Sequence, residues 1–236
     1  MRFYVEPSPS GTWYVKLDGH DAPVSRHDSE EEAIERRDAY ARGTAREEDG
    51  ELVELRDGAT VRIRPIRPDD KPRVLQAFDA LGARSRYRRF LGYKKELSTA
   101  ELESFTEVDH VDHEALAAVD PATGDGLGIA RYVRLDERRD TAEAAVTVVD
   151  AWQGRGLGTA LLERLAARAR EEGIREFTAT LLSDNRAVLA IFRRLGVLRV
   201  VRDGPVQEID VCLPVGDGDC MGEALRVAAR GDVTTA

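Results

Sequence analysis

The chain has 236 residues, of which 42% are hydrophobic and 33% are charged, and its formal net charge is −9. A chain of this length can bury one full core and still include a small accessory domain. The negative charge argues against non-specific nucleic-acid binding, which needs several uncompensated cations along one surface. No apolar run approaches the roughly 20 residues of a membrane span, and no signal-peptide core follows Met1. We therefore expect a soluble protein of the cytoplasm.

Residues 1–42 predict a small accessory module. A hairpin and a third short strand are expected, at residues 2–5, 12–17 and 23–25. Ser29 then starts a helix that runs to Ala41, with Glu32 in the capping-box position. The Trp-Tyr-Val-Lys strand and the acidic start of this helix resemble a small bacterial domain of unassigned function. The resemblance implies no activity for the module.

Residues 43–57 are charged, bounded by glycine at residue 43 and without periodic pattern, so we expect a linker there. The second domain, residues 58–213, alternates strand and helix patterns. Its expected strands are residues 61–66, 116–119, 127–133, 142–149, 177–182, 198–201 and 207–213. Its main expected helices are residues 71–81, 159–172 and 183–196. The second of these helices connects two parallel strands. Residues 214–236 form a tail with a short helix near residues 223–229.

A glycine-rich turn follows the strand at residues 142–149 and leads into a helix. Its sequence is Gln153-Gly154-Arg155-Gly156-Leu157-Gly158. Glycine accepts turn conformations closed to other residues, and the first N–H groups of a helix attract anions, so the turn predicts a phosphate ligand. The lysine that a nucleotide-hydrolysing P-loop needs after its last glycine is missing. The glycine spacing does not match a dinucleotide-binding turn either.

The Gln-x-x-Gly-x-Gly pattern of this turn resembles the pyrophosphate-binding motif of the GNAT superfamily of N-acetyltransferases, which hold acetyl-coenzyme A (acetyl-CoA) there. Residues 85–90, 97–105 and 108–116 further resemble the Pat-type protein-lysine acetyltransferases of bacteria. The resemblance covers residues 58–213 and implies an α/β GNAT fold, with a mixed central sheet flanked by helices. It also implies acetyl-CoA as cosubstrate and an amine as acceptor, and it leaves a homodimer open.

The same resemblance implies which residues hold the cosubstrate. Backbone amides of the turn would bind the pyrophosphate; they belong to Gln153, Gly154, Arg155, Gly156, Leu157 and Gly158. Thr159 would add a hydroxyl contact. Val148 and Val149 would pair their backbone with the pantetheine arm, and a backbone N–H near Val148 would meet the oxyanion. Asn185 matches the asparagine that hydrogen-bonds the cofactor near its pantetheine, with a helix cap as its alternative role.

Glu143 is the candidate catalytic residue. Acetylation needs a neutral amine, and a lysine amine with a pKa of about 10.4 costs roughly 4 kcal/mol to deprotonate at neutral pH. By resemblance, a strand glutamate in the Ala-Glu-x-Ala-Val context of the Pat-type enzymes is the general base. Apolar neighbours would bury Glu143 and raise its pKa toward the useful range. The alternative is a carboxylate at the edge of a strand that faces solvent.

Phe192 stands where many GNAT members carry a tyrosine that protonates the departing thiolate, so we assign no general acid. A coenzyme A thiol has a pKa of about 8.5, and water can serve instead. Protein lysine is the acceptor that the resemblance implies. A small amine of polyamine or aminoglycoside type is one alternative, and a non-catalytic acetyl-CoA sensor is another.

Two further runs of side chains have competing interpretations. Residues 109–114 are rich in metal-ligating types, but they would alternate faces and no further His or Cys cluster completes a shell, so we expect no metal site. A basic run between Arg84 and Lys95 could attract an acidic protein or the ribose phosphate of the cofactor. Its alternative is a solvated helix face.

Overall fold

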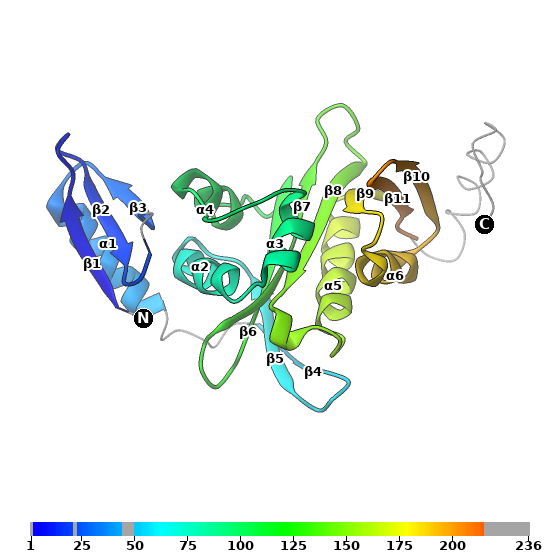
Figure 1. Ribbon diagram of the computed structural model, residues 1–236, viewed down its shortest axis with the longest axis horizontal. Helices are drawn as coiled ribbons and strands as arrows, with labels where there is room; N and C mark the ends of the chain where they lie inside the picture. Colours follow the sequence, from blue (N-terminus) through cyan, green and yellow to red (C-terminus); the bar gives the residue numbers. More distant parts are fainter. Residues whose placement is uncertain (1, 21–22, 44–49, 215–236) are drawn as a thin grey trace.

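The computed structural model describes residues 2–20, 23–43 and 50–214, which form two sheets and the helices that cover them (Figure 1). The N-terminal sheet is antiparallel in the order β1-β2-β3; its strands are β1 (Phe3–Pro7), β2 (Trp13–Leu17) and β3 (Ser25–His27). It packs against α1 (Glu30–Gly43), whose start is capped by the Ser29 hydroxyl, an acceptor for the Glu32 amide at 3.2 Å. The predicted hairpin and helix module is confirmed.

The second sheet has eight strands in the order β10-β11-β9-β8-β7-β6-β5-β4. These are β4 (Glu51–Glu54), β5 (Thr60–Pro65), β6 (His113–Val119), β7 (Gly126–Arg134), β8 (Thr141–Val148), β9 (Glu176–Leu182), β10 (Leu198–Asp203) and β11 (Val206–Cys212). Within the described ranges, β8 and β9 are the one parallel pair, and the other neighbours are antiparallel. The sheet is therefore mixed, as predicted.

The edge strand β4 lies inside the stretch that we expected to be a linker. It pairs antiparallel with β5, and the Asp57-Gly58 turn closes the hairpin, with Gly58 at a φ of +83° and Leu55 N–H donating to Ala59 O at 2.8 Å. Glutamates at both ends of β4 hide its two apolar residues from a pattern search. Glu51–Glu54 thus belong to the sheet, and the residues after them form the turn into β5.

Helices cover both faces of the large sheet (Figure 1). They are α2 (Lys71–Asp79), α3 (Ala83–Phe90) and α4 (Thr99–Thr106) on one face, and α5 (Leu157–Glu171) and α6 (Arg186–Leu195) on the other. The helix expected at residues 159–172 is α5, and its apolar stripe is fully buried against the sheet; the stripe consists of Leu161, Leu162, Leu165, Ala166 and Ala169. Over the described part of the chain, every helix is too short or too polar to span a bilayer.

The accessory module and the large domain share one hydrophobic cluster. Val15, Leu17 and Val24 of the module belong to the same buried group as Leu75 of α2 and Leu102 of α4. A hydrogen bond at this contact joins the hydroxyl of Thr99 to the backbone oxygen of Pro23 at 3.0 Å. The module therefore packs on the face that carries α2 and α4.

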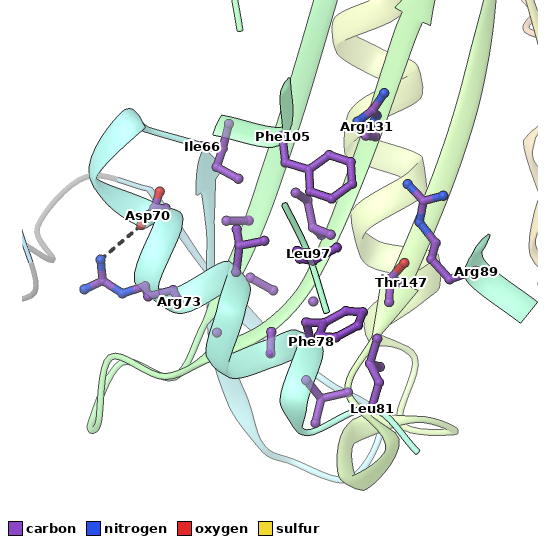
Figure 2. Close-up of a pocket in the computed structure, with 18 of the residues that line it drawn as sticks. Ile66, Asp70, Arg73, Phe78, Leu81, Arg89, Leu97, Phe105, Arg131 and Thr147 are labelled. Atoms are coloured by element: carbon purple, nitrogen blue, oxygen red, sulfur yellow. Dashed lines mark hydrogen bonds and ion pairs between the residues drawn. The ribbon is translucent and has the colours of Figure 1, made fainter. Parts of the chain in front are cut away.

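A buried ion network connects β5 to the start of α2. The Asp70 carboxylate accepts two hydrogen bonds of 2.7 Å from Arg64 and one of 3.0 Å from Arg73, an ion pair drawn in Figure 2. The Arg67 amide donates to it at 2.9 Å. Burial opposes ionisation of Asp70, but these partners outweigh it and hold the pKa of Asp70 below its ordinary value.

We predict that Asp70→Asn lowers the free energy of unfolding by about 3–5 kcal/mol, because it leaves two buried guanidinium groups without their carboxylate. Because the pKa of Asp70 is lowered in the folded state, its ionised carboxylate stabilises the fold at pH values above the unfolded-state pKa of about 3.9. This contribution is lost as the pH falls through the folded-state pKa of Asp70. Urea unfolding at pH 7 and at lower pH should therefore show the difference between wild type and variant shrinking in acid.

The matched control is Asp69→Asn, at the neighbouring carboxylate. Asp69 is partly exposed and reaches only Arg36, at 3.4 Å, so we expect its loss to cost less than about 1 kcal/mol. Equal effects of the two substitutions would contradict the role of the buried network.

Candidate active site

The strands β8 and β9 diverge in the middle of the large sheet. Their parallel pairing covers three residue pairs and ends at Glu143 with Thr178. Beyond this point β8 stays paired with β7 as far as Val148, and β9 stays paired with β11 as far as Leu182. An opening therefore separates residues 144–148 of β8 from the second half of β9.

The backbone of β8 presents polar groups to this opening. Val149 donates its N–H to Leu127 O at 2.9 Å, and Thr141 accepts from the Leu135 N–H, so both face β7. Successive residues of a strand alternate in direction, which turns the amides of Val146 and Val148 to the opposite edge. Val148 can therefore meet a ligand with its backbone, whereas both backbone groups of Val149 are used, because its oxygen accepts from the Trp152 N–H at 2.8 Å. Val146 is a candidate that sequence reasoning missed.

A cleft of about 420 Å³ occupies this opening. It is lined by residues of α3, β8, the glycine turn, β9 and α6. Of the predicted site residues, the structure places six on its wall: Glu143, Val148, Gln153, Gly154, Gly158 and Asn185. Residues separated by more than 40 positions in the chain thus meet in one cavity.

The other predicted residues lie outside the cleft wall. Leu157 is buried in the core, and Val149 lines a second cavity, between the sheet and the helices α2 and α4. Arg155 forms an ion pair with Asp57 at 3.4 Å, and its guanidinium lies 4.7 Å from the ring centre of Trp152. The remaining two, Gly156 and Thr159, are half-buried around the start of α5.

The glycine turn has the backbone that its sequence predicts. Gly154 and Gly156 adopt left-handed conformations, with φ of +78° and +97°. Gly156 is the N-cap of α5, and among the described residues no side chain caps this helix end. The first amides of α5 are therefore open to an anion, which the helix dipole also favours.

Two polar side chains border the turn. Gln153 donates from its amide to Val148 O at 3.0 Å and lies 3.3 Å from the hydroxyl of Ser85 on α3, so it links the turn to both sides of the cleft. Asn185 is the N-cap of α6 by position and only 7% exposed, yet its side chain makes no capping hydrogen bond within the described chain. Its amide is available to a ligand in the cleft.

Glu143 projects into the cleft at the last paired position of β8 and β9. We expected apolar neighbours to bury it, and this is wrong, because the side chain is exposed. The strand divergence is the physical reason, since it leaves the carboxylate beside an open cavity. It acts electrostatically on Arg89 of α3 and Arg131 of β7: burial lowers the pKa of both arginines, and the charge of Glu143 opposes that shift.

The basic run on and after α3 has two kinds of member. Arg84 and Arg88 both contact Asp184, each at 3.0 Å, and Lys94 contacts Glu101 at 2.6 Å. These cations are satisfied by acids on the protein. Arg89 instead lines the cleft.

The acidic and histidine-rich run at residues 109–114 has a structural role. Asp109 accepts backbone N–H bonds of 2.9 Å from the three residues that start at Val111, and so closes a turn. The buried carboxylate of Glu114 lies 2.7 Å from His110 and 3.4 Å from Arg168. Within the described residues, no group of three such side chains is arranged to hold a metal ion.

Comparison with known families matches both parts of the chain. Residues 60–197 match the model of the acetyltransferase (GNAT) domain. Residues 3–64 match a family of uncharacterised bacterial proteins, DUF2188. The first match covers the strands β5 to β9, the glycine turn and the residues that line the cleft.

Individual relatives agree with the first match. The acetyltransferase Pat of Mycolicibacterium smegmatis is 36% identical over 165 residues, which are 70% of this chain and 49% of that protein. The chain therefore spans about half the length of this relative. The crystal structure of the GNAT domain of S. lividans PAT has 37% identity and a TM-score of 0.64, over 69% of this chain and 96% of that one. The Salmonella typhimurium protein yncA, solved with its cofactor acetyl-CoA, shares the fold at 21% identity and a TM-score of 0.52, over 67% of this chain and 98% of its own.

Proposed function

The chain belongs to the GNAT family and is an N-acetyltransferase, and we propose that it transfers the acetyl group of acetyl-CoA to lysine side chains of proteins. One observation carries the proposal: the glycine turn and Glu143 line the same cleft. The similarity to Pat supports a protein acceptor. We assign the accessory module to residues 1–42 and the catalytic domain to residues 58–213, extended at its N-terminal side by the edge strand β4.

The GNAT family uses acetyl-CoA as its acetyl donor, and the residues of this cleft fit that molecule. The open amides at the start of α5 suit its pyrophosphate. The free edge of β8 at Val146 and Val148 suits the amide groups of pantetheine, as a further strand would. Asn185 adds a side-chain amide on the opposite wall. The Val148 N–H, fixed by the strand, is placed to stabilise negative charge that develops on the thioester oxygen.

Glu143 is the proposed general base. It takes a proton from the ammonium group of the acceptor, directly or through water. The neutral amine then forms the carbon–nitrogen bond as the carbon–sulfur bond breaks, and the nitrogen releases its second proton to water as the amide forms. An exposed carboxylate can pass this proton on to solvent. Phe192 lines the cleft but has no proton to give, so the departing thiolate takes its proton from water.

We predict that Gly158→Val weakens the binding of coenzyme A roughly tenfold to hundredfold. A Cβ at this position would lie 3.1 Å from Ile191 Cδ1 and 3.6 Å from Val148 Cγ2, so the added methyl groups occupy the cleft. Isothermal titration with coenzyme A measures the change.

The matched control for this substitution is Gly173→Asn, at the far end of α5. Gly173 has a φ of +79° that asparagine tolerates, and a Cβ there meets nothing within 4 Å. We expect the Gly173→Asn variant to bind coenzyme A with the affinity of the wild type. Unchanged affinity of the Gly158 variant would place the cofactor elsewhere.

We predict that Glu143→Gln lowers kcat by about 100-fold to 10,000-fold, the usual contribution of a general base, and leaves acetyl-CoA affinity within about twofold. Release of coenzyme A with a panel of purified proteins and small amines measures turnover, and mass spectrometry locates the acetyl group.

Glu137→Gln makes the same acid-to-amide change at an exposed position outside the cleft, and we expect full activity from it. Unchanged turnover of the Glu143 variant would remove the base assignment. Acetylation of small amines without any protein lysine would overturn the proposed acceptor class.

A further inference from the structure

Two arginines lie near each other on the wall of the second cavity, which shares Arg89 and Thr147 with the cleft. Arg89 comes from α3 and Arg131 from β7, and Figure 2 shows both side chains beside Thr147 and Phe105. Their guanidinium carbons lie 5.9 Å and 5.0 Å from the centre of the Phe105 ring. One aromatic ring thus holds two cations from separate elements near each other.

Neither guanidinium group is neutralised by the protein. Within the described residues, Arg89 and Arg131 donate no hydrogen bond and form no ion pair, in contrast to Arg84 and Arg88, which share Asp184. Burial, followed by the charge of Arg131, lowers the pKa of Arg89 to about 10, and Glu143 opposes the shift. Two half-buried positive charges therefore face one exposed negative charge, and the free donors can bind an anion.

An apolar cavity continues beyond the arginines. It has a volume of about 70 Å³ and lies between the sheet and the helices α2 and α4 (Figure 2). Phe78, Leu97 and Phe105 are among the apolar side chains on its wall, and Arg89 and Arg131 stand at the same wall. A group bound by the arginines would have apolar surface on one side and Glu143 on the other.

We propose that Arg89 and Arg131 together bind a carboxylate of the acceptor and so place its amine at Glu143. A guanidinium group binds a carboxylate through two parallel hydrogen bonds. A carboxylate shared by both arginines also offsets the repulsion between their positive charges. Arg131 lies two residues from Val133, the partner of Glu143 across β7 and β8, so the two side chains are diagonal neighbours on one face of the sheet, and the bound amine and carboxylate lie close together in space. The inference deepens the proposed function and relies on it for the reaction.

Two kinds of acceptor carry this chemistry. A free α-amino acid has a carboxylate one carbon from its amine, and an apolar side chain would enter the cavity; its turnover without any protein lysine would support the carboxylate site and overturn the acceptor class proposed above. A protein lysine with an aspartate beside it presents the same charge from a neighbouring residue. Matched pairs separate these sources: L-leucine against L-leucinamide, and a blocked peptide with Lys-Asp against its Lys-Asn twin.

We expect the acid of at least one pair to have a kcat/KM roughly tenfold to hundredfold above that of its amide. Arg131→Met and Arg89→Met should abolish this preference, mainly through KM, and Arg131→Lys should keep part of it. Arg138→Met is the charge-matched control, since Arg138 is exposed, lies outside the cleft and pairs with Glu176 at 3.1 Å. It should leave the preference intact.

Thermal unfolding separates binding from a structural role. Removal of a half-buried charge that has no partner should leave the melting temperature of Arg131→Met at or above that of the wild type. A large fall in melting temperature, together with equal loss for acid and amide, would mean that the arginine only supports the fold and would overturn the proposal.

Binding of the products keeps the test independent of turnover. In the presence of coenzyme A, N-acetyl-L-leucine and the acetylated Lys-Asp peptide are titrated into wild type and Arg131→Met, each beside its amide twin. If the wild type binds the acids more tightly than their amides and Arg131→Met removes this difference, the carboxylate site is supported. If no acceptor is turned over in the same experiments, the proposed function is overturned. Equal kcat/KM and equal binding of acids and amides in the wild type would overturn the site while the acetyltransferase proposal stands.

Discussion

The end of parallel pairing between β8 and β9 is the constraint on which the site depends. Each strand is held firmly on its other side, β8 by seven pairs with β7 and β9 by seven pairs with β11. The two strands can therefore separate without losing their places in the sheet. Had the pairing continued, the amides of Val146 and Val148 would be used inside the sheet. The divergence supplies the free backbone edge, exposes Glu143 and brings the glycine turn beside both.

Charged groups in the part of the chain that the structure describes are of two kinds: some are paired with an opposite charge inside the protein, and others have no such pair. Asp70 sits between Arg64 and Arg73, and each charge there has a hydrogen-bonded partner inside the protein. In that network the Asp70 carboxylate accepts hydrogen bonds from Arg64, Arg73 and the Arg67 amide, so protein groups rather than a ligand occupy it. Arg89 and Arg131 form no ion pair within the described residues and stand on the wall of the apolar cavity beside the cleft. Unpartnered charge at a half-buried position costs free energy, so its place beside the reacting groups points to binding rather than to stability.

Local pattern was sufficient for the parts of the structure that depend on neighbours in sequence. The apolar stripe of α5, the left-handed glycines at 154 and 156 and the parallel strand pair all follow from residue type and spacing. The exposure of Glu143 was missed because it depends on where β9 leaves β8, which no short pattern encodes. Arg131 carried no signal, because a single cation in a strand looks like an edge residue until its neighbours are placed.

The helix α3 joins the two halves of the cleft. It has no fully buried residue, and its exposed arginines reach Asp184, next to Asn185, while Ser85 meets Gln153 of the glycine turn. Exposed ion pairs of this kind contribute little net stability, since solvent screens them and ordering long side chains costs entropy. Arg89, on the same helix, faces the acceptor side. The protein itself anchors α3 through Phe90, whose ring packs edge-on against Phe78 of α2, and ligands on the two sides of α3 would add contacts that hold it over the reacting groups.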